Sequence, residues 1–94
     1  MNRRNLLKEG RLVEHFKREF LSEDEKLGTL KYLYKIVGVG RHTENGEEFV
    51  IYRAMYKDEN GEYGLHVRPI DMFLSEVDRV KYPNSTRKYR FTAV

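Results

Sequence analysis

The chain has 94 residues, 39% hydrophobic and 13% aromatic, which is enough for one small globular domain and too apolar for a disordered segment. It contains no cysteine, which excludes disulfide and thiolate chemistry, and no apolar run of membrane-span length. The net charge of +3 is too small for a chain committed to nucleic acid, although both ends are basic and residues 58–78 are acidic. We expect a single cytoplasmic domain over residues 1–94, with no membrane partner and no signal peptide.

The first part of the chain gives two interpretations. Residues 1–9 are basic, and we expect them to be mobile. Leu12, Phe16 and Phe20 then recur at a spacing of four, which is typical of one face of a helix. A short strand from Leu12 to Phe16 is the alternative, and the residue pattern leaves both open.

Three segments rich in β-branched and aromatic residues follow, at residues 30–42, 48–56 and 63–68. They are separated by the pairs Asn45-Gly46 and Asn60-Gly61. Two-residue type I′ turns prefer Asn-Gly because both central residues need a positive φ. The pattern therefore predicts an antiparallel three-stranded meander over residues 34–68.

The last third of the chain predicts a helical turn and a final strand. Residues 70–73 fit one helical turn that starts after Pro69, and Phe73, Leu74 and Val77 would then pack on the sheet. Residues 88–94 alternate loosely and fit a last strand. The expected fold is mainly β: a small SH3-like barrel or a strongly bent antiparallel sheet, with one or two short helices.

Counting outward from two-residue turns predicts the register, and with it the two faces of the sheet. In this register Arg53 lies opposite both Gly38 and Arg68. The expected core face consists of Val37, Val39, Val50, Tyr52, Ala54, Tyr56, Leu65 and Val67. The other face consists of Ile36, Gly38, Gly40, His42, Phe49, Ile51, Arg53, Met55, His66 and Arg68.

This second face has the features of a binding surface. Its two glycines remove side chains from the middle of a strand, which is typical where a ligand or another backbone approaches closely. Two arginines directly opposite each other cost free energy unless an acid or a bound anion lies between them. The alternative is that the glycines relieve crowding where a barrel strand bends, and that the arginines pair with nearby carboxylates. The candidate ligand-binding residues are Arg53, Arg68, His66, His42, Gly38 and Gly40.

Motifs for catalysis are scarce. The chain has no phosphate-binding loop or nucleophile elbow, and the spacing of its histidines does not suit a metal, so we expect no catalytic residue, metal or cofactor. His42 and Glu44 supply a base and an acid in one turn, so a small enzyme that uses them is one alternative. A protein-interaction domain that pairs through an open sheet edge is another.

Several short pieces of the chain occur in the order found in the bacterial DUF1653 family, a small domain of unknown function, which the chain resembles over roughly residues 10–94. They are His15-Phe16-Lys17, His42-Thr43-Glu44, Tyr52-Arg53, Val67-Arg68-Pro69 and Met72-Phe73. The resemblance implies a compact, mostly β domain without an established activity. The motif positions are His15, His42, Glu44, Glu48, Tyr52, Arg53, Arg68, Pro69 and Phe73.

The chain departs from the family pattern twice. About a dozen residues are inserted within residues 18–33, and His66 stands where the family tends to carry Trp. Since the resemblance supplies no activity, the functional hypothesis comes from the residues. It is a non-catalytic binding module whose Arg53, His66 and Arg68 face takes an anionic ligand: a nucleotide, a nucleic acid or an acidic peptide or protein.

Overall fold

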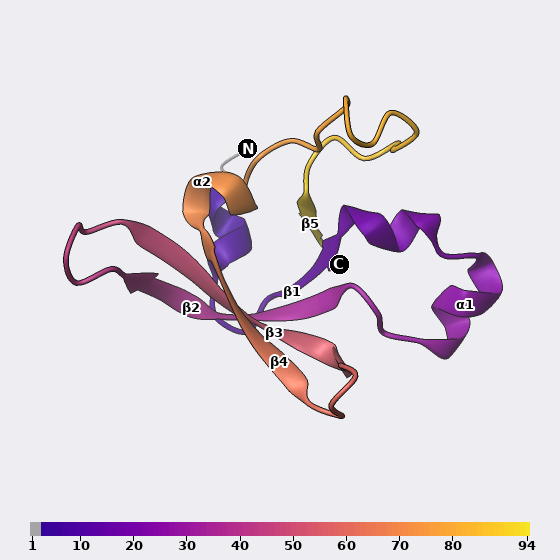
Figure 1. Ribbon diagram of the computed structural model, residues 1–94, viewed down its shortest axis with the longest axis horizontal. Helices are drawn as coiled ribbons and strands as arrows, with labels where there is room; N and C mark the ends of the chain where they lie inside the picture. Colours follow the sequence, from indigo (N-terminus) through magenta and orange to yellow (C-terminus); the bar gives the residue numbers. More distant parts are fainter. Residues whose placement is uncertain (1–2) are drawn as a thin grey trace.

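The computed structural model describes residues 3–94 and shows a five-stranded antiparallel sheet with strand order β4-β3-β2-β1-β5 (Figure 1). The elements are η1 Arg3–Leu7, β1 Leu12–His15, η2 Phe16–Phe20, α1 Glu23–Gly28, β2 Leu33–Arg41, β3 Glu48–Lys57, β4 Tyr63–Pro69, α2 Ile70–Phe73 and β5 Phe91–Ala93. The prediction of a mainly β fold is confirmed. The sheet is strongly bent but not closed into a barrel, and β4 and β5 are its two edges.

Both interpretations of the segment after Gly10 are partly right. β1 is a strand that pairs with β2 on one side and with β5 on the other. The chain then turns into the 3-10 helix η2, whose start is capped by His15. Within the expected mobile start, residues 3–7 form η1, and Leu6 and Leu7 are buried. Leu6 and Leu7 thus belong to the core cluster, while residues 1–2 lie outside the described part of the chain.

The segment expected as an insertion, residues 18–33, contains α1. Ser22 and Glu25 form a capping box at its start, in which each side chain bonds the backbone N–H of the other residue. None of the residues of α1 is buried. Arg18 fastens the segment by donating to the carbonyls of Lys26 and Lys31. In Figure 1 it extends away from the sheet at one end of the molecule.

The core lies on one side of the bent sheet, where η1 and α2 cover it (Figure 1). Its centre is a stacked pair of rings, Phe73 of α2 and Phe91 of β5, whose centroids are 4.0 Å apart. Pro69 precedes α2, and Phe73 and Val77 are buried, as the sequence predicts. The buried members of the core cluster are Leu6, Leu7, Val13, Tyr34, Ile36, Val50, Tyr52, Ala54, Ile70, Phe73 and Phe91.

The first predicted turn is longer than two residues. His42 N–H bonds the Glu47 carbonyl, so residues 43–46 form the loop, and Gly46 alone of these has positive φ, at 74°. The pairing near the loop therefore shifts by two residues, which leaves each side chain on its predicted face. A bulge between Ile36 and Gly38 then shifts the register again. This odd shift turns Ile36 into the core, where it is 1% exposed, and corrects its predicted place on the second face.

The second predicted turn is also longer. Asp58 N–H bonds the Glu62 carbonyl, so the loop has three residues and ends in Gly61 with φ 77°. With a further irregularity between Arg53 and Lys57, Arg53 lies opposite Leu65 rather than opposite Arg68. This net shift is an odd number of residues, so every β4 side chain changes face.

The predicted faces are therefore wrong for both sides of β4. Leu65 and Val67 are 53% and 60% exposed instead of lying in the core. His66 and Arg68 lie on the core side, opposite Tyr52 and Val50.

Candidate functional site

His66 and Arg68 project from β4 over the same tyrosine. The imidazole of His66 is stacked on the ring of Tyr52, with centroids 5.5 Å apart and planes inclined by 27°. Arg68 donates from Nε to the Tyr52 hydroxyl at 3.2 Å, and its guanidinium lies 5.8 Å from the centre of the Phe91 ring. His66 is exposed and Arg68 is half-buried. Tyr52 thus contacts both the exposed His66 ring and the Arg68 guanidinium.

His15 reaches the same region from β1. Its ring is buried and meets Phe91 edge-on at 4.9 Å, and its Nδ1 accepts the backbone N–H of Lys17 at 3.2 Å. Burial is the main reason why the pKa of His15 is lowered from 6.5 to about 4. The further causes are the positive charges of Arg68, Lys17 and Arg90. His15 is therefore neutral near pH 7, and three cations lie close to it.

Arg90, which directly precedes β5, is the fourth residue of this region. Its Nε donates to Ser75 Oγ at 3.3 Å. Burial and then the charge of Arg68 lower the pKa of Arg90, whereas Tyr82, Tyr52 and Asp78 raise it. Within residues 3–94 neither Arg68 nor Arg90 has a carboxylate within ion-pair distance. Two partly buried guanidinium groups therefore lie in this region without a directly paired acid.

We call His15, His66, Arg68 and Arg90 the arginine–histidine cluster. Positive charge continues beside it at Tyr82. The ammonium groups of Lys17 and Lys81 lie 5.5 and 5.6 Å from the centre of this ring. The pKa of the Tyr82 phenol is lowered, mainly by a hydrogen bond with Lys17 and further by the two lysine charges. This surface favours negative charge in whatever contacts it.

Gly38, Gly40 and Arg53 lie on the opposite side of the sheet from His66 and Arg68. Gly38 pairs with Ile51 and Gly40 pairs with Phe49, as β2 and β3 pass each other. A side chain at Gly38 would meet nothing within 4 Å, so this position is open. Arg53 lies on the same face and donates to the Tyr63 carbonyl. The structure therefore separates Arg53 and the two glycines from His66 and Arg68.

The proposed enzyme residues lie at the tip of a hairpin. His42 and Glu44 are both exposed, and His42 Nδ1 accepts the Glu44 backbone N–H at 3.2 Å. Local hydrogen bonding of this kind is what a turn residue does. Within residues 3–94, no three histidine or carboxylate side chains are grouped so that they could hold a metal ion. His42 and Glu44 are therefore exposed turn residues that bond each other.

Three other motif positions have structural contacts. Glu48 lies at the start of β3, 3.9 Å from a guanidinium nitrogen of Arg4. Pro69 precedes α2 and Phe73 is fully buried. By contrast His15, Tyr52 and Arg68, which are far apart in the sequence, meet around Phe91.

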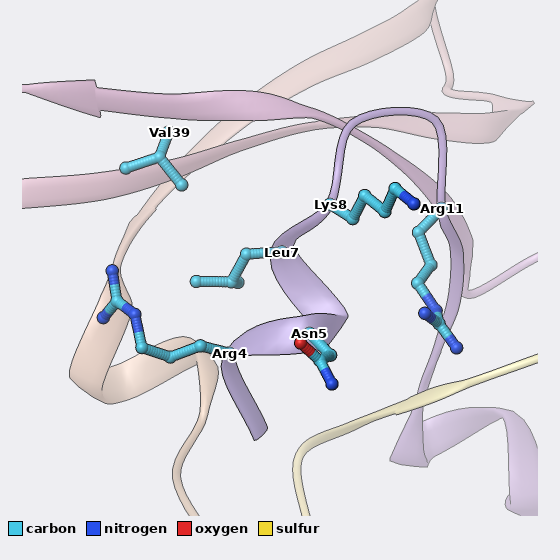
Figure 2. A pocket seen from close by; sticks show the side chains of 6 residues that line it. All are labelled: Arg4, Asn5, Leu7, Lys8, Arg11 and Val39. Atoms are coloured by element: carbon cyan, nitrogen blue, oxygen red, sulfur yellow. The ribbon is translucent and has the colours of Figure 1, made fainter. Parts of the chain in front are cut away.

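A separate basic surface lies over η1. A hollow of about 550 Å³ is lined by Arg4, Asn5, Leu7, Lys8, Arg11 and Val39 (Figure 2). Figure 2 shows Arg4 on one side of the hollow and Lys8 and Arg11 on the other. A neighbouring hollow of about 610 Å³ includes Lys8, Lys35 and Arg53 in its lining. Neither hollow is lined by an aromatic side chain, unlike the arginine–histidine cluster.

Sequence reasoning missed His15 and Arg90 as members of one site. His15 is a motif position, and Val13 and His15 alternate in the way that two residues on one strand face do. That signal indicates the face but not the partner strand. Arg90 joins the site because β5 pairs with β1, across 75 residues of sequence between His15 and Phe91.

Comparison with known proteins gives one match. The family model described as "Protein of unknown function (DUF1653)" matches residues 11–93, nearly the whole chain. No curated protein and no solved structure matches the chain. Within residues 3–94, no helix has the length and apolar character needed to cross a membrane.

Proposed function

We propose that this chain, which belongs to the DUF1653 family of proteins of unknown function, is a non-catalytic module that binds an anionic ligand at the arginine–histidine cluster. The ligand is a nucleotide, a nucleic acid or an acidic peptide. The observation that carries the proposal is geometric: Arg68 and Arg90 are partly buried, are held through Nε by the Tyr52 and Ser75 hydroxyl groups, and have no carboxylate within ion-pair distance within residues 3–94.

An anion between these arginines would remove an unfavourable interaction as well as add a favourable one. Guanidinium groups bind phosphate and carboxylate in a planar, two-bonded geometry. Arg68 is held by the Tyr52 hydroxyl and Arg90 by Ser75 Oγ, so little side-chain freedom is lost on binding. Each of these bonds uses Nε, which leaves the terminal nitrogens of both groups for a ligand.

The test removes the two charges and compares the result with an equal loss elsewhere. The test variant is Arg68→Gln with Arg90→Gln. The matched control is Lys35→Gln with Arg53→Gln, a cross-strand pair of exposed cations on the opposite face. Binding of labelled single-stranded oligothymidylate, ATP and a poly-glutamate peptide is measured by fluorescence anisotropy at two salt concentrations, after circular dichroism confirms each fold.

We expect the test variant to bind at least one probe about tenfold more weakly than the wild type, with a salt dependence reduced by roughly one to two charges. The control should change the affinity by less than about threefold. Equal losses in the two variants would assign the effect to net charge. That result, or no binding of any probe at low salt, would overturn the proposal.

A second candidate function uses the edge of the sheet. β4 ends the strand order and carries three exposed apolar side chains, those of Tyr63, Leu65 and Val67. A seven-residue edge strand of this kind is a template for pairing with another chain. Light scattering tests self-pairing: a dimer that Val67→Lys converts to a monomer supports this function, and a wild-type monomer at high concentration counts against self-pairing.

A further inference from the structure

The exposed imidazole of His66 lies where a ligand ring would be stacked. One face of the ring rests on Tyr52, and Tyr34 meets it edge-on at 5.8 Å, so two tyrosines fix its orientation. The neighbouring position on the same face is Gly64. A side chain there would come within 3.0 Å of His66 Nε2, so the absence of one leaves room for the imidazole. His66 is nevertheless exposed, although its supports Tyr34 and Tyr52 are buried.

Tyrosine hydroxyl groups, which can bond to the edge of a planar ligand, lie near the His66 ring. The hydroxyl groups of Tyr34 and Tyr56 are 2.9 Å apart and bond each other. Tyr56 and Tyr32 are only partly buried, and their rings lie 6.4 Å apart. Aromatic rings with hydroxyl donors and acceptors at their edges are typical of surfaces on which nucleic-acid bases stack.

Tyr52 supports both the His66 ring and the Arg68 guanidinium. Tyr52 carries His66 on its ring and holds Arg68 through its hydroxyl, and His66 and Arg68 are two residues apart on one strand face. A ligand that uses both must carry a planar ring close to an anionic group. An acidic peptide has the anion without a required ring, whereas a nucleotide has both.

We infer that the ligand is a phosphate that bears a nucleobase, with the base stacked on His66 and the phosphate bound by Arg68 and Arg90. This inference rests on the proposed function and narrows its ligand class. The same chemistry is present in a free nucleotide and in a single strand of nucleic acid. The binding experiment must separate these two sources.

The test compares probes with and without a base. AMP is compared with ribose 5-phosphate, and a short oligothymidylate with an abasic phosphodiester of equal length. The variants are His66→Leu, which removes the π surface, and His66→Phe, which keeps a ring but cannot be protonated. Arg68→Gln removes the phosphate contact. Affinities are measured by calorimetry, and circular dichroism confirms the fold of each variant.

We expect the wild type to bind the base-bearing probe at least about fivefold more tightly than its abasic partner. His66→Leu should abolish most of this preference, and His66→Phe should retain it. Arg68→Gln should weaken both probes and leave their ratio unchanged. A stronger response to oligothymidylate than to AMP identifies a strand, and similar affinities identify a free nucleotide.

Three results would overturn the inference. If abasic probes bind as tightly as base-bearing ones, anion binding stands and the stacking inference fails. If His66→Leu keeps the preference, the base lies elsewhere. If no probe binds, the proposed function and the inference fail together.

Discussion

Protonation of His15 should destabilise the fold in a defined pH window. Its ring is 8% exposed and packs on Phe91, and its Nδ1 must be unprotonated to accept the Lys17 N–H. The charges that act on it come from Arg68 on β4, Lys17 on η2 and Arg90 before β5, and all are positive. The substitution His15→Phe keeps a ring in this place and removes the titration.

The magnitude follows from the pKa. Folding lowers the pKa of His15 from 6.5 to about 4, so the unfolded chain binds the proton more tightly than the folded one. The contribution of neutral His15 to the free energy of unfolding is complete above pH 6.5 and falls as the pH drops from 6.5 to about 4. The full difference corresponds to roughly 3 kcal/mol at 1.36 kcal/mol per pKa unit. Solvent screens the smaller part of this difference that comes from the partly exposed charges of Arg68, Lys17 and Arg90, so we expect about 2–3 kcal/mol, most of it from burial of the ring.

Urea denaturation followed by circular dichroism at pH 7.5, 5.5 and 4.5 measures this effect. Carboxylate titration contributes to both proteins and cancels in the difference between wild type and His15→Phe. The variant loses the hydrogen bond from Lys17, a cost of about 1 kcal/mol that does not change with pH. The wild type should be more stable than the variant at pH 7.5. On acidification we expect its free energy of unfolding to fall below that of the variant. Parallel stability curves between pH 7.5 and 4.5 would refute the reasoning.

Other predictions concern packing, turns and the 85–87 loop, and all are measured as free energies of unfolding in urea. Phe91→Ala should cost about 3–5 kcal/mol, because the ring is 1% exposed and stacked on another ring, and Phe91→Leu should cost less than half as much. Gly61→Ala should cost about 1 kcal/mol, because φ is 77°, whereas Gly38→Ala, at an open position, should change stability by less than about 0.5 kcal/mol; equal effects would contradict this. Glu19→Gln should cost roughly 1–2 kcal/mol at pH 7, because the carboxylate accepts from Thr86 N–H and Oγ1. Against the effect of burial, hydrogen bonds with Ser85 and then Thr86 lower the pKa of Glu19, so this difference should shrink as the pH falls through the lowered value, and a difference that does not decrease on acidification would count against it.

The strands could be predicted from the sequence because their composition and the Asn-Gly pairs mark where each begins and ends. β2, β3 and β4 lie within one to three residues of their expected bounds. The loop lengths could not be predicted in the same way, since Asn-Gly also fits four-residue and three-residue loops that end in a positive-φ glycine. A one-residue error in loop length moves every side chain of the next strand to the other face. His66 and Arg68 changed face for this reason.

The cluster itself depends on contacts that are distant in the sequence. The sequence pattern predicts Arg53 opposite Arg68, whereas in the structure Arg53 lies opposite Leu65, and the charge of Arg68 lowers the pKa of Arg90 instead. The pairing of β1 with β5 brings Arg90 and His15 together, and no local pattern near either residue specifies that pairing. The order of the motifs did mark His15, Tyr52 and Arg68, but order alone does not place them around one ring.

The most direct test of an anionic ligand at the arginine–histidine cluster is a map of amide chemical shifts as the ¹⁵N-labelled protein is titrated with AMP and with oligothymidylate. The proposed site predicts that the largest shifts fall in residues 15–17, 66–68 and 90–91, which three separate segments bring together. Shifts confined to residues 4–11, 35 and 53, around the two basic hollows, would place the ligand on the other basic surface and contradict the proposal.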